Sequence, residues 1–197
     1  CGSVGYEDMG LFIDWCSLFQ EPRDTPAMLS AFKGSLAHIN IWYASALTTV
    51  YFVTDEPAGL VPYHSRGWTT FEYLITWLLQ WGNLKPWDTV VFASGEPREK
   101  NVANIWEPPS PSDVDSFLEG GEHADKTFTN GADRPLVARK FREATEDIFG
   151  SVDALSFPFA GWGPRDGERF AKVLRHCTKV KKIVLTGNKD LGDAGVS

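Results

Sequence analysis

Residues 180–191 read V-K-K-I-V-L-T-G-N-K-D-L, and this stretch decides the fold expected for the C-terminal part of the chain. An earlier stretch matches it at a constant spacing of 28 residues. The matching positions are Val152 with Val180, Leu155 with Ile183, Phe157 with Leu185, and Gly167 with Gly195. A period of this length indicates two copies of one supersecondary unit. The alternative is a chance strand–turn–strand similarity inside an ordinary α/β domain.

The residue types within each copy predict a short strand followed by a turn. Ile183 and Leu185 alternate, so both would point to the interior from one face of a strand. Asn188 can satisfy backbone groups where the chain leaves the strand. Residues 167–177 would form the helix between the two strands, through the apolar positions Phe170, Val173 and Leu174.

This pattern resembles the L-x-x-L-x-L-x-x-N-x-L signature of leucine-rich repeats, with one residue more between Asn188 and Leu191. G-D-A-G-V at 192–196 resembles the ribonuclease-inhibitor-like subclass, in which it leads into the next helix. The resemblance implies a solenoid that recognises protein partners. Because one and a half repeats cannot bury their own apolar faces, we expect further repeats after Ser197.

The N-terminal half alternates apolar runs with helical periodicity, which predicts a parallel α/β layered sheet. The expected buried strands are L-F-I-D at 11–14, LTTVYFVT at 47–54 and DTVVFA at 88–93. One helix is expected over residues 27–46. A second would be capped by Thr69 or Thr70 and bury the apolar positions Phe71, Leu74, Ile75 and Leu78.

These elements divide the chain into four expected parts. They are an α/β domain (1–98), a Pro/Gly-rich connection (99–132) with a short helix at 112–118, a connecting helix (133–150) and the start of a repeat array (151–197). The chain begins with Cys1 and not with Met, so we expect upstream sequence to be missing.

The segment R-G-W-T-T-F-E at 66–72 brings together charged, aromatic and helix-starting residues. Trp68 and Glu72 are four residues apart and would share one face of a helix. At the carboxyl ends of the strands, the ring could stack on a base or nicotinamide, while the carboxylate contacts a ribose or steadies an oxocarbenium ion. The alternative is that Trp68 anchors the core and Glu72 complements the helix dipole.

Five further residues are weaker candidates for ligand contact or catalysis. Arg66 and His64 flank the same helix start, and Asp14 ends an expected strand where α/β sheets bind ligands. Cys16 could be a nucleophile with His38 or His64 as base, although a buried structural cysteine is the simpler interpretation. The sequence contains no metal-ligand cluster, phosphate-binding glycine loop or Ser/His/Asp signature.

The α/β half resembles Toll/interleukin-1 receptor (TIR) domains. L-F-I-D resembles the second strand of the family, residues 27–46 its second helix and LTTVYFVT its third strand, and W-T-T-F-E is similar to the W-C-x-x-E that opens the next helix. The resemblance implies a flavodoxin-like parallel sheet lacking its first strand. It also assigns to Glu72 the catalytic role of TIR enzymes that cleave NAD, and places Trp68 in the same pocket. In this chain Thr69 replaces the usual Cys, and the first strand and helix, which supply part of that pocket, have no counterpart.

A second resemblance covers nearly the whole chain. F-I-D-W-C-S-L-F-Q (12–20), W-Y-A-S-A-L-T-T-V (42–50), R-G-W-T-T-F-E and K-T-F-T-N-G-A-D (126–133) resemble segments of a group of unicellular-algal and dinoflagellate proteins in which leucine-rich repeats follow. No activity is known for that group, so this resemblance implies architecture and leaves function open.

Charge and cysteine content narrow the possible partners and location. The formal net charge of −7 opposes a broad nucleic-acid or anionic-membrane surface, and the basic run Lys179, Lys181 and Lys182 is expected on a solvent face. The longest uncharged stretch, 39–54, is too short and polar to span a bilayer. Three cysteines are too few for a disulfide framework and favour a reducing, cytoplasmic location.

Three functions follow as hypotheses. The first is an intracellular signalling protein that combines self-association through a TIR-like domain with partner recognition by leucine-rich repeats. The second is a hydrolase of NAD or a related nucleotide, with Glu72 catalytic and NAD as substrate rather than cofactor. The third is a scaffold that only presents repeats.

Overall fold

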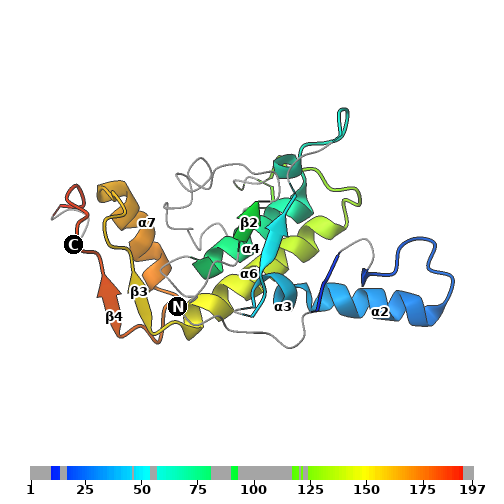
Figure 1. Cartoon of the computed structure of the whole chain (residues 1–197), viewed down its shortest axis with the longest axis horizontal. Coiled ribbons are helices and arrows are strands. Elements are labelled where there is room, and N and C mark those ends of the chain that lie inside the picture. The colour runs from blue at the N-terminus through cyan, green and yellow to red at the C-terminus, as the bar shows by residue number, and fades with distance from the viewer. Residues whose placement is uncertain are drawn as a thin grey trace. The chain divides into compact units, whose positions relative to one another are not determined.

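In the computed structural model the chain divides into two compact units, Cys1–Ile39 and Asn40–Ser197. The structure describes residues 10–13, 17–45, 47–53, 57–80, 90–92, 117–119, 121 and 124–192 (Figure 1).

The main element of the first unit is helix α2, Pro26–Ala37. Thr25 caps it by accepting the N–H of Met28 at 3.2 Å, and Pro26 occupies the first turn, where a missing N–H costs nothing. The N–H of His38 turns back to the carbonyl of Ser35 at 3.1 Å, which closes the helix before α3, Ile39–Tyr43, begins. The helical structure expected over 27–46 is therefore confirmed for most of this range, but it is divided into two helices at His38 and ends at Tyr43.

The strand expected at 11–14 is wrong for the residues that the structure describes. Leu11 and Ile13 are 75% and 49% exposed and belong to no strand. Ser17 instead bonds the backbone of Ile13: its N–H donates to the Ile13 carbonyl at 2.7 Å, and its Oγ accepts the Ile13 N–H at 3.0 Å. Such side-chain–backbone bonds compete with strand pairing. Asp14 and Cys16 lie outside the described residues.

The second unit contains the parallel strands that the alternating pattern predicted. β1, Val50–Phe52, pairs in parallel with β2, Val90–Phe92, in the register Val50 with Val90 and Phe52 with Phe92. β1 is shorter than the apolar run 47–54, since residues 47–49 and 53 lie outside it. The 3-10 helix η1, Tyr63–Ser65, and helix α4, Gly67–Gln80, lie between them in the chain. The coarse prediction of parallel α/β structure is thus confirmed for this pair.

Two helices form the core of this part of the protein. α4 runs beside α6, Asp133–Ser151, and contacts it along its length (Figure 1). Three of the four apolar positions predicted for α4 are buried, namely Phe71, Ile75 and Leu78, whereas Leu74 is half-buried. α6 confirms the helix expected from 133 and extends it to Ser151. Of the short helix expected at 112–118, the structure describes only Phe117 and Leu118, which lie in a turn.

The C-terminal segment forms a second parallel strand pair with a helix between its strands. β3, Ala154–Ser156, pairs with β4, Lys182–Val184, and the partners Leu155 and Ile183 stand at the 28-residue offset seen in the sequence. Leu155 is buried, whereas Ile183, which was expected to point to the interior, is 42% exposed. The helix α7, Pro164–Leu174, begins three residues earlier than expected. Its start is set by Pro164 and by the Asp166 carboxylate, which accepts the Gly163 N–H at 2.9 Å.

Candidate functional site

The start of α4 carries most of the candidate residues, and its first turn differs from the expected one. The helix begins at Gly67, so Thr69 and Thr70 lie inside the first turn and are not its caps. The Thr70 hydroxyl donates to the Arg66 carbonyl at 2.8 Å, and the Thr69 hydroxyl donates to the carbonyl of Tyr63. The Thr70 hydroxyl also lies 3.3 Å from the His64 carbonyl, so both threonines fasten the helix start to η1.

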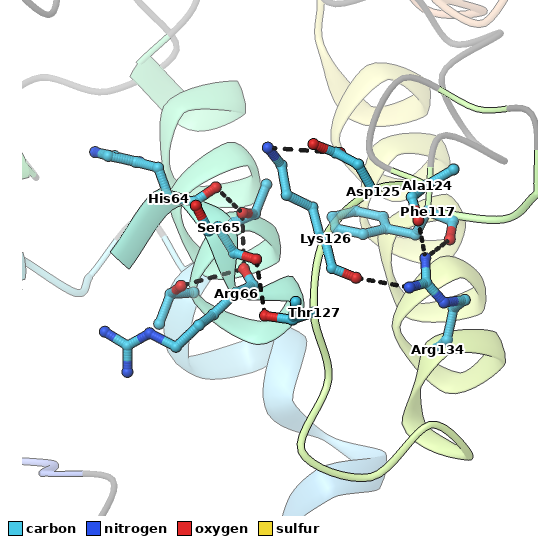
Figure 2. Close-up of polar contacts among 11 residues, drawn as sticks. His64, Ser65, Arg66, Phe117, Ala124, Asp125, Lys126, Thr127 and Arg134 are labelled. Carbon is cyan, nitrogen blue, oxygen red and sulfur yellow. Dashed lines mark hydrogen bonds and ion pairs between the residues drawn. The ribbon is translucent and has the colours of Figure 1, made fainter. Parts of the chain in front are cut away.

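A distant segment of chain covers this helix start. Thr127 accepts the Gly67 N–H at 2.8 Å, and its own N–H and hydroxyl donate to the Ser65 carbonyl at 2.9 and 3.0 Å (Figure 2). The ring of Phe128 lies directly on Gly67. The motifs R-G-W-T-T-F-E and K-T-F-T-N-G-A-D thus pack against each other, a contact that neither motif predicted alone.

Arg134 in the first turn of α6 holds the covering segment in place. Its guanidinium donates to the carbonyls of Phe117, Ala124 and Lys126 at 2.8, 2.9 and 2.6 Å (Figure 2). It also lies 4.9 Å from the centre of the Phe128 ring, within the range of a cation–π contact. One side chain therefore organises the loop that closes over α4.

Trp68 connects α4 to the beginning of α6. Its indole N–H donates to the Asp133 carboxylate at 3.0 Å, and its ring meets Phe71 edge-on with 6.0 Å between the ring centres. The side chain is half-buried. These contacts agree with the interpretation of Trp68 as a core anchor, while stacking on a nucleotide stays a prediction.

Glu72 lies in a polar cluster with Tyr63 and Arg66. Tyr63 is buried, and burial is the largest cause that raises the pKa of its hydroxyl, followed by the negative charge of Glu72. The Arg66 guanidinium opposes this rise and lies 5.7 Å from the centre of the Tyr63 ring. The Glu72 carboxylate and the Arg66 guanidinium thus act in opposite directions on the pKa of the Tyr63 phenol.

Aromatic rings connect this cluster to the carboxyl end of β1. Phe52, the last residue of β1, lies 6.1 Å from Tyr63 and 5.3 Å from Tyr73 between ring centres. His64 is exposed and meets Tyr63 and Tyr73 edge-on at 5.1 and 5.3 Å. Arg66, His64 and Glu72 therefore all interact with Tyr63, whereas Trp68 is directed toward α6.

Asn188 joins the two copies of the C-terminal unit. Its buried amide donates to the Phe157 and Leu185 carbonyls at 2.8 and 2.9 Å, and its Oδ1 accepts the Trp162 N–H at 3.1 Å. The side chain therefore satisfies backbone groups of both copies, as its position after the strand predicted. The equivalent position in the first copy is Ala160, which cannot make these bonds.

An aromatic cluster fills the interior beneath the two strands. Phe157 and Trp162 lie 4.5 Å apart between ring centres, and Phe170 of α7 lies 5.5 and 5.2 Å from them. Cys177 is buried beside this helix, where its thiol donates to the Val173 carbonyl at 3.5 Å. Burial raises the pKa of the Cys177 thiol to about 11, which opposes formation of a reactive thiolate.

Within the described parts of the chain, no group of three histidine, cysteine or acidic side chains is placed to hold a metal ion. In the same residues, no helix combines the length and apolar character needed to cross a membrane. No family model, curated protein or solved structure matches the chain.

Proposed function

We propose that this protein is a recognition protein in which a TIR-like α/β part precedes the first units of a leucine-rich repeat array. The observation that carries the proposal is the register of β3 and β4, in which Leu155 pairs with Ile183 at the sequence offset of the repeat. Parallel strands stacked at a constant offset are the building principle of solenoids, whose strand surfaces bind proteins.

The contacts of Asn188 support the same proposal. A solenoid needs polar groups that bridge successive copies, because each turn leaves backbone carbonyls and amides without strand partners. Asn188 bonds a carbonyl of each copy and an amide of the first. An isolated strand–turn–strand unit would not require one buried side chain to serve both copies.

The test is photo-crosslinking from the exposed side of the strands. A photoreactive residue placed at Ser156 on β3 should capture a discrete protein from an extract of the source cells. The same residue at Glu168, on α7, is the matched control and should capture none. If the full chain sediments as a monomer and Ser156 captures no more than Glu168, the proposal is wrong.

A second candidate function is hydrolysis of NAD or a related nucleotide with Glu72 catalytic. The observation that favours it is the cluster of Glu72, Arg66 and Tyr63 beside the carboxyl end of β1. The purified protein should then release nicotinamide from NAD. Glu72→Gln should abolish release without lowering the melting temperature, while Glu146→Gln, on the exposed side of α6, should leave it unchanged. A folded protein without turnover would remove this candidate.

A further inference from the structure

Two equivalent positions of the repeated unit share an unusual backbone conformation. Phe159 and Gly187 stand at the 28-residue offset, with φ angles of 55° and 83°. Glycine adopts this left-handed conformation readily, whereas for a bulky side chain it costs free energy. A phenylalanine in this position therefore needs a reason beyond local folding.

Burial of the Phe159 side chain does not explain its left-handed backbone conformation. Its ring is 78% exposed, although phenylalanine is among the residues most often found in the interior. One side of the ring lies on Gly187, where an added Cβ would come 2.2 Å from Phe159 Cδ1. The backbone N–H of Phe159 donates to the Thr186 carbonyl at 2.8 Å, which holds the residue beside the end of β4. The aromatic surface is thus presented to solvent on a fixed backbone.

Six outward positions near the two strands carry no acidic side chain. We define the strand face as the outward positions of the two strands and the turns after them: Ala154, Ser156, Pro158, Lys182, Val184 and Thr186. All six are exposed or half-buried, and five are small or of medium size. Lys182 is beside Ala154 in the strand register, so its charge stands at the opposite end of the face from Phe159.

The charge of this region is opposite to that of the whole chain. Residues 152–192 contain eight lysines and arginines and four acidic residues, a net charge of +4, whereas the whole chain carries −7. Complementary charge speeds and orients association with a partner. Three of the eight basic residues lie on α7, and the strand face itself carries Lys182 alone. Lys182, within a region of net positive charge, therefore favours an acidic partner at the strand face, and the remainder of the chain would repel it.

We infer that the strand face binds an extended acidic segment of a partner protein, with Phe159 as its apolar anchor and Lys182 as its charge contact. The inference rests on the proposed recognition function and adds the chemistry of the partner. Lys182 and Thr186, whose carbonyl accepts the Phe159 N–H, are four residues apart in the chain, which is at most about 13 Å because Thr186 begins a turn after β4. The partner segment should therefore carry its carboxylate about four residues from its apolar side chain.

The experiment selects random short peptides displayed on phage against the full chain. The selected peptides should be enriched in Asp or Glu together with an apolar residue. Their affinity should fall about tenfold or more on Phe159→Gly and on Lys182→Glu, as expected for central anchors of an interface. Lys172→Glu, an equal charge change on exposed α7, is the matched control and should weaken binding far less.

A thermal unfolding measurement separates recognition from a structural role. Phe159→Gly should leave the melting temperature about unchanged, because relief of the left-handed strain is offset by the greater chain entropy that glycine gives the unfolded state. A lower melting temperature would mean that the ring stabilises the fold, and it would overturn the inference. So would selected peptides that lack acidic residues, or displacement of the peptides by duplex DNA.

The selection also separates failure of this inference from failure of the proposed function. If peptides are selected but tolerate both Phe159→Gly and Lys182→Glu, recognition stands and the assigned partner chemistry is wrong. If the folded chain selects no peptide above background, both the partner chemistry and the proposed recognition are contradicted.

Discussion

Phe128 lies directly on Gly67: a Cβ added to Gly67 would come 2.0 Å from Cζ of the Phe128 ring. The contact joins the first residue of α4 to a loop that follows much later in the chain. No side chain larger than a hydrogen atom fits between them. The α4 start, with its candidate residues, is therefore positioned by a segment that is remote in sequence.

Gly67→Ala should destabilise the protein by about 1–3 kcal/mol, since the methyl group must displace the ring. Gly150→Ala is the matched control, because Gly150 is also in a helix but a Cβ added there would have no atom within 4 Å. It should be neutral or stabilising. Urea unfolding of both variants makes the comparison. Adding Phe128→Ala to Gly67→Ala should recover part of the loss, and purely additive effects would contradict the contact.

Arg134→Met should destabilise the loop over α4 more than Arg139→Met, although both residues belong to α6. Arg134 donates to three carbonyls, and a single hydrogen bond from a charged group contributes about 1.5–3 kcal/mol. Arg139 is 64% exposed and has only a 3.8 Å ion pair with Glu143, so its loss should cost at most about 1 kcal/mol. Hydrogen exchange at the Gly67 and Thr127 amides, together with urea unfolding, measures the difference. Equal losses in the two variants would contradict the assigned role.

Elements with strong local signals could be predicted from the sequence. Asp133 and Pro135 mark the start of α6 correctly, because an acidic first turn and an early proline are local preferences of helix starts. The 28-residue offset predicted the pairing of Leu155 with Ile183, because equivalent residues of stacked copies stand side by side. In both cases the information lies in neighbouring or regularly spaced residues.

Elements that depend on unique tertiary contacts could not be predicted. The run at 11–14 has strand-like composition, but a strand needs a partner, and Ser17 takes both backbone hydrogen-bonding groups of Ile13 instead. At the candidate site, the cover over Gly67 comes from Thr127 and Phe128, whose sequence shows no signal for that pairing. The one indication in the sequence is the glycine at position 67, which permits another segment to approach the helix backbone closely.

Asn188→Ala should destabilise the C-terminal unit by roughly 2–3 kcal/mol, because it leaves the Phe157 and Leu185 carbonyls buried without that donor. Asn188→Asp keeps the acceptor for Trp162 and loses the donors, so it should be destabilising as well. Asn130→Ala, at an exposed turn, is the control and should have little effect. The amides of Phe157 and Trp162 should exchange faster only in the Asn188 variants, and protection equal to that of the parent protein would refute the bridging role.

Cys177 should make the folded protein less stable as the pH rises from about 9 to about 11. Burial raises the pKa of the folded thiol from 9.0 to about 11, so over this window the unfolded state loses its proton first. The contribution of the buried, protonated thiol to folding stability is fully present below the pKa of the unfolded state. It is lost as the pH rises through the pKa of the folded state. Cys177→Ala removes the thiol and should show a shallower decline in urea stability over the same window, even though its stability at neutral pH is lower. Identical pH dependence in the two proteins, or rapid alkylation of Cys177 in the folded protein at pH 8, would show that the thiol is accessible and not held protonated by burial.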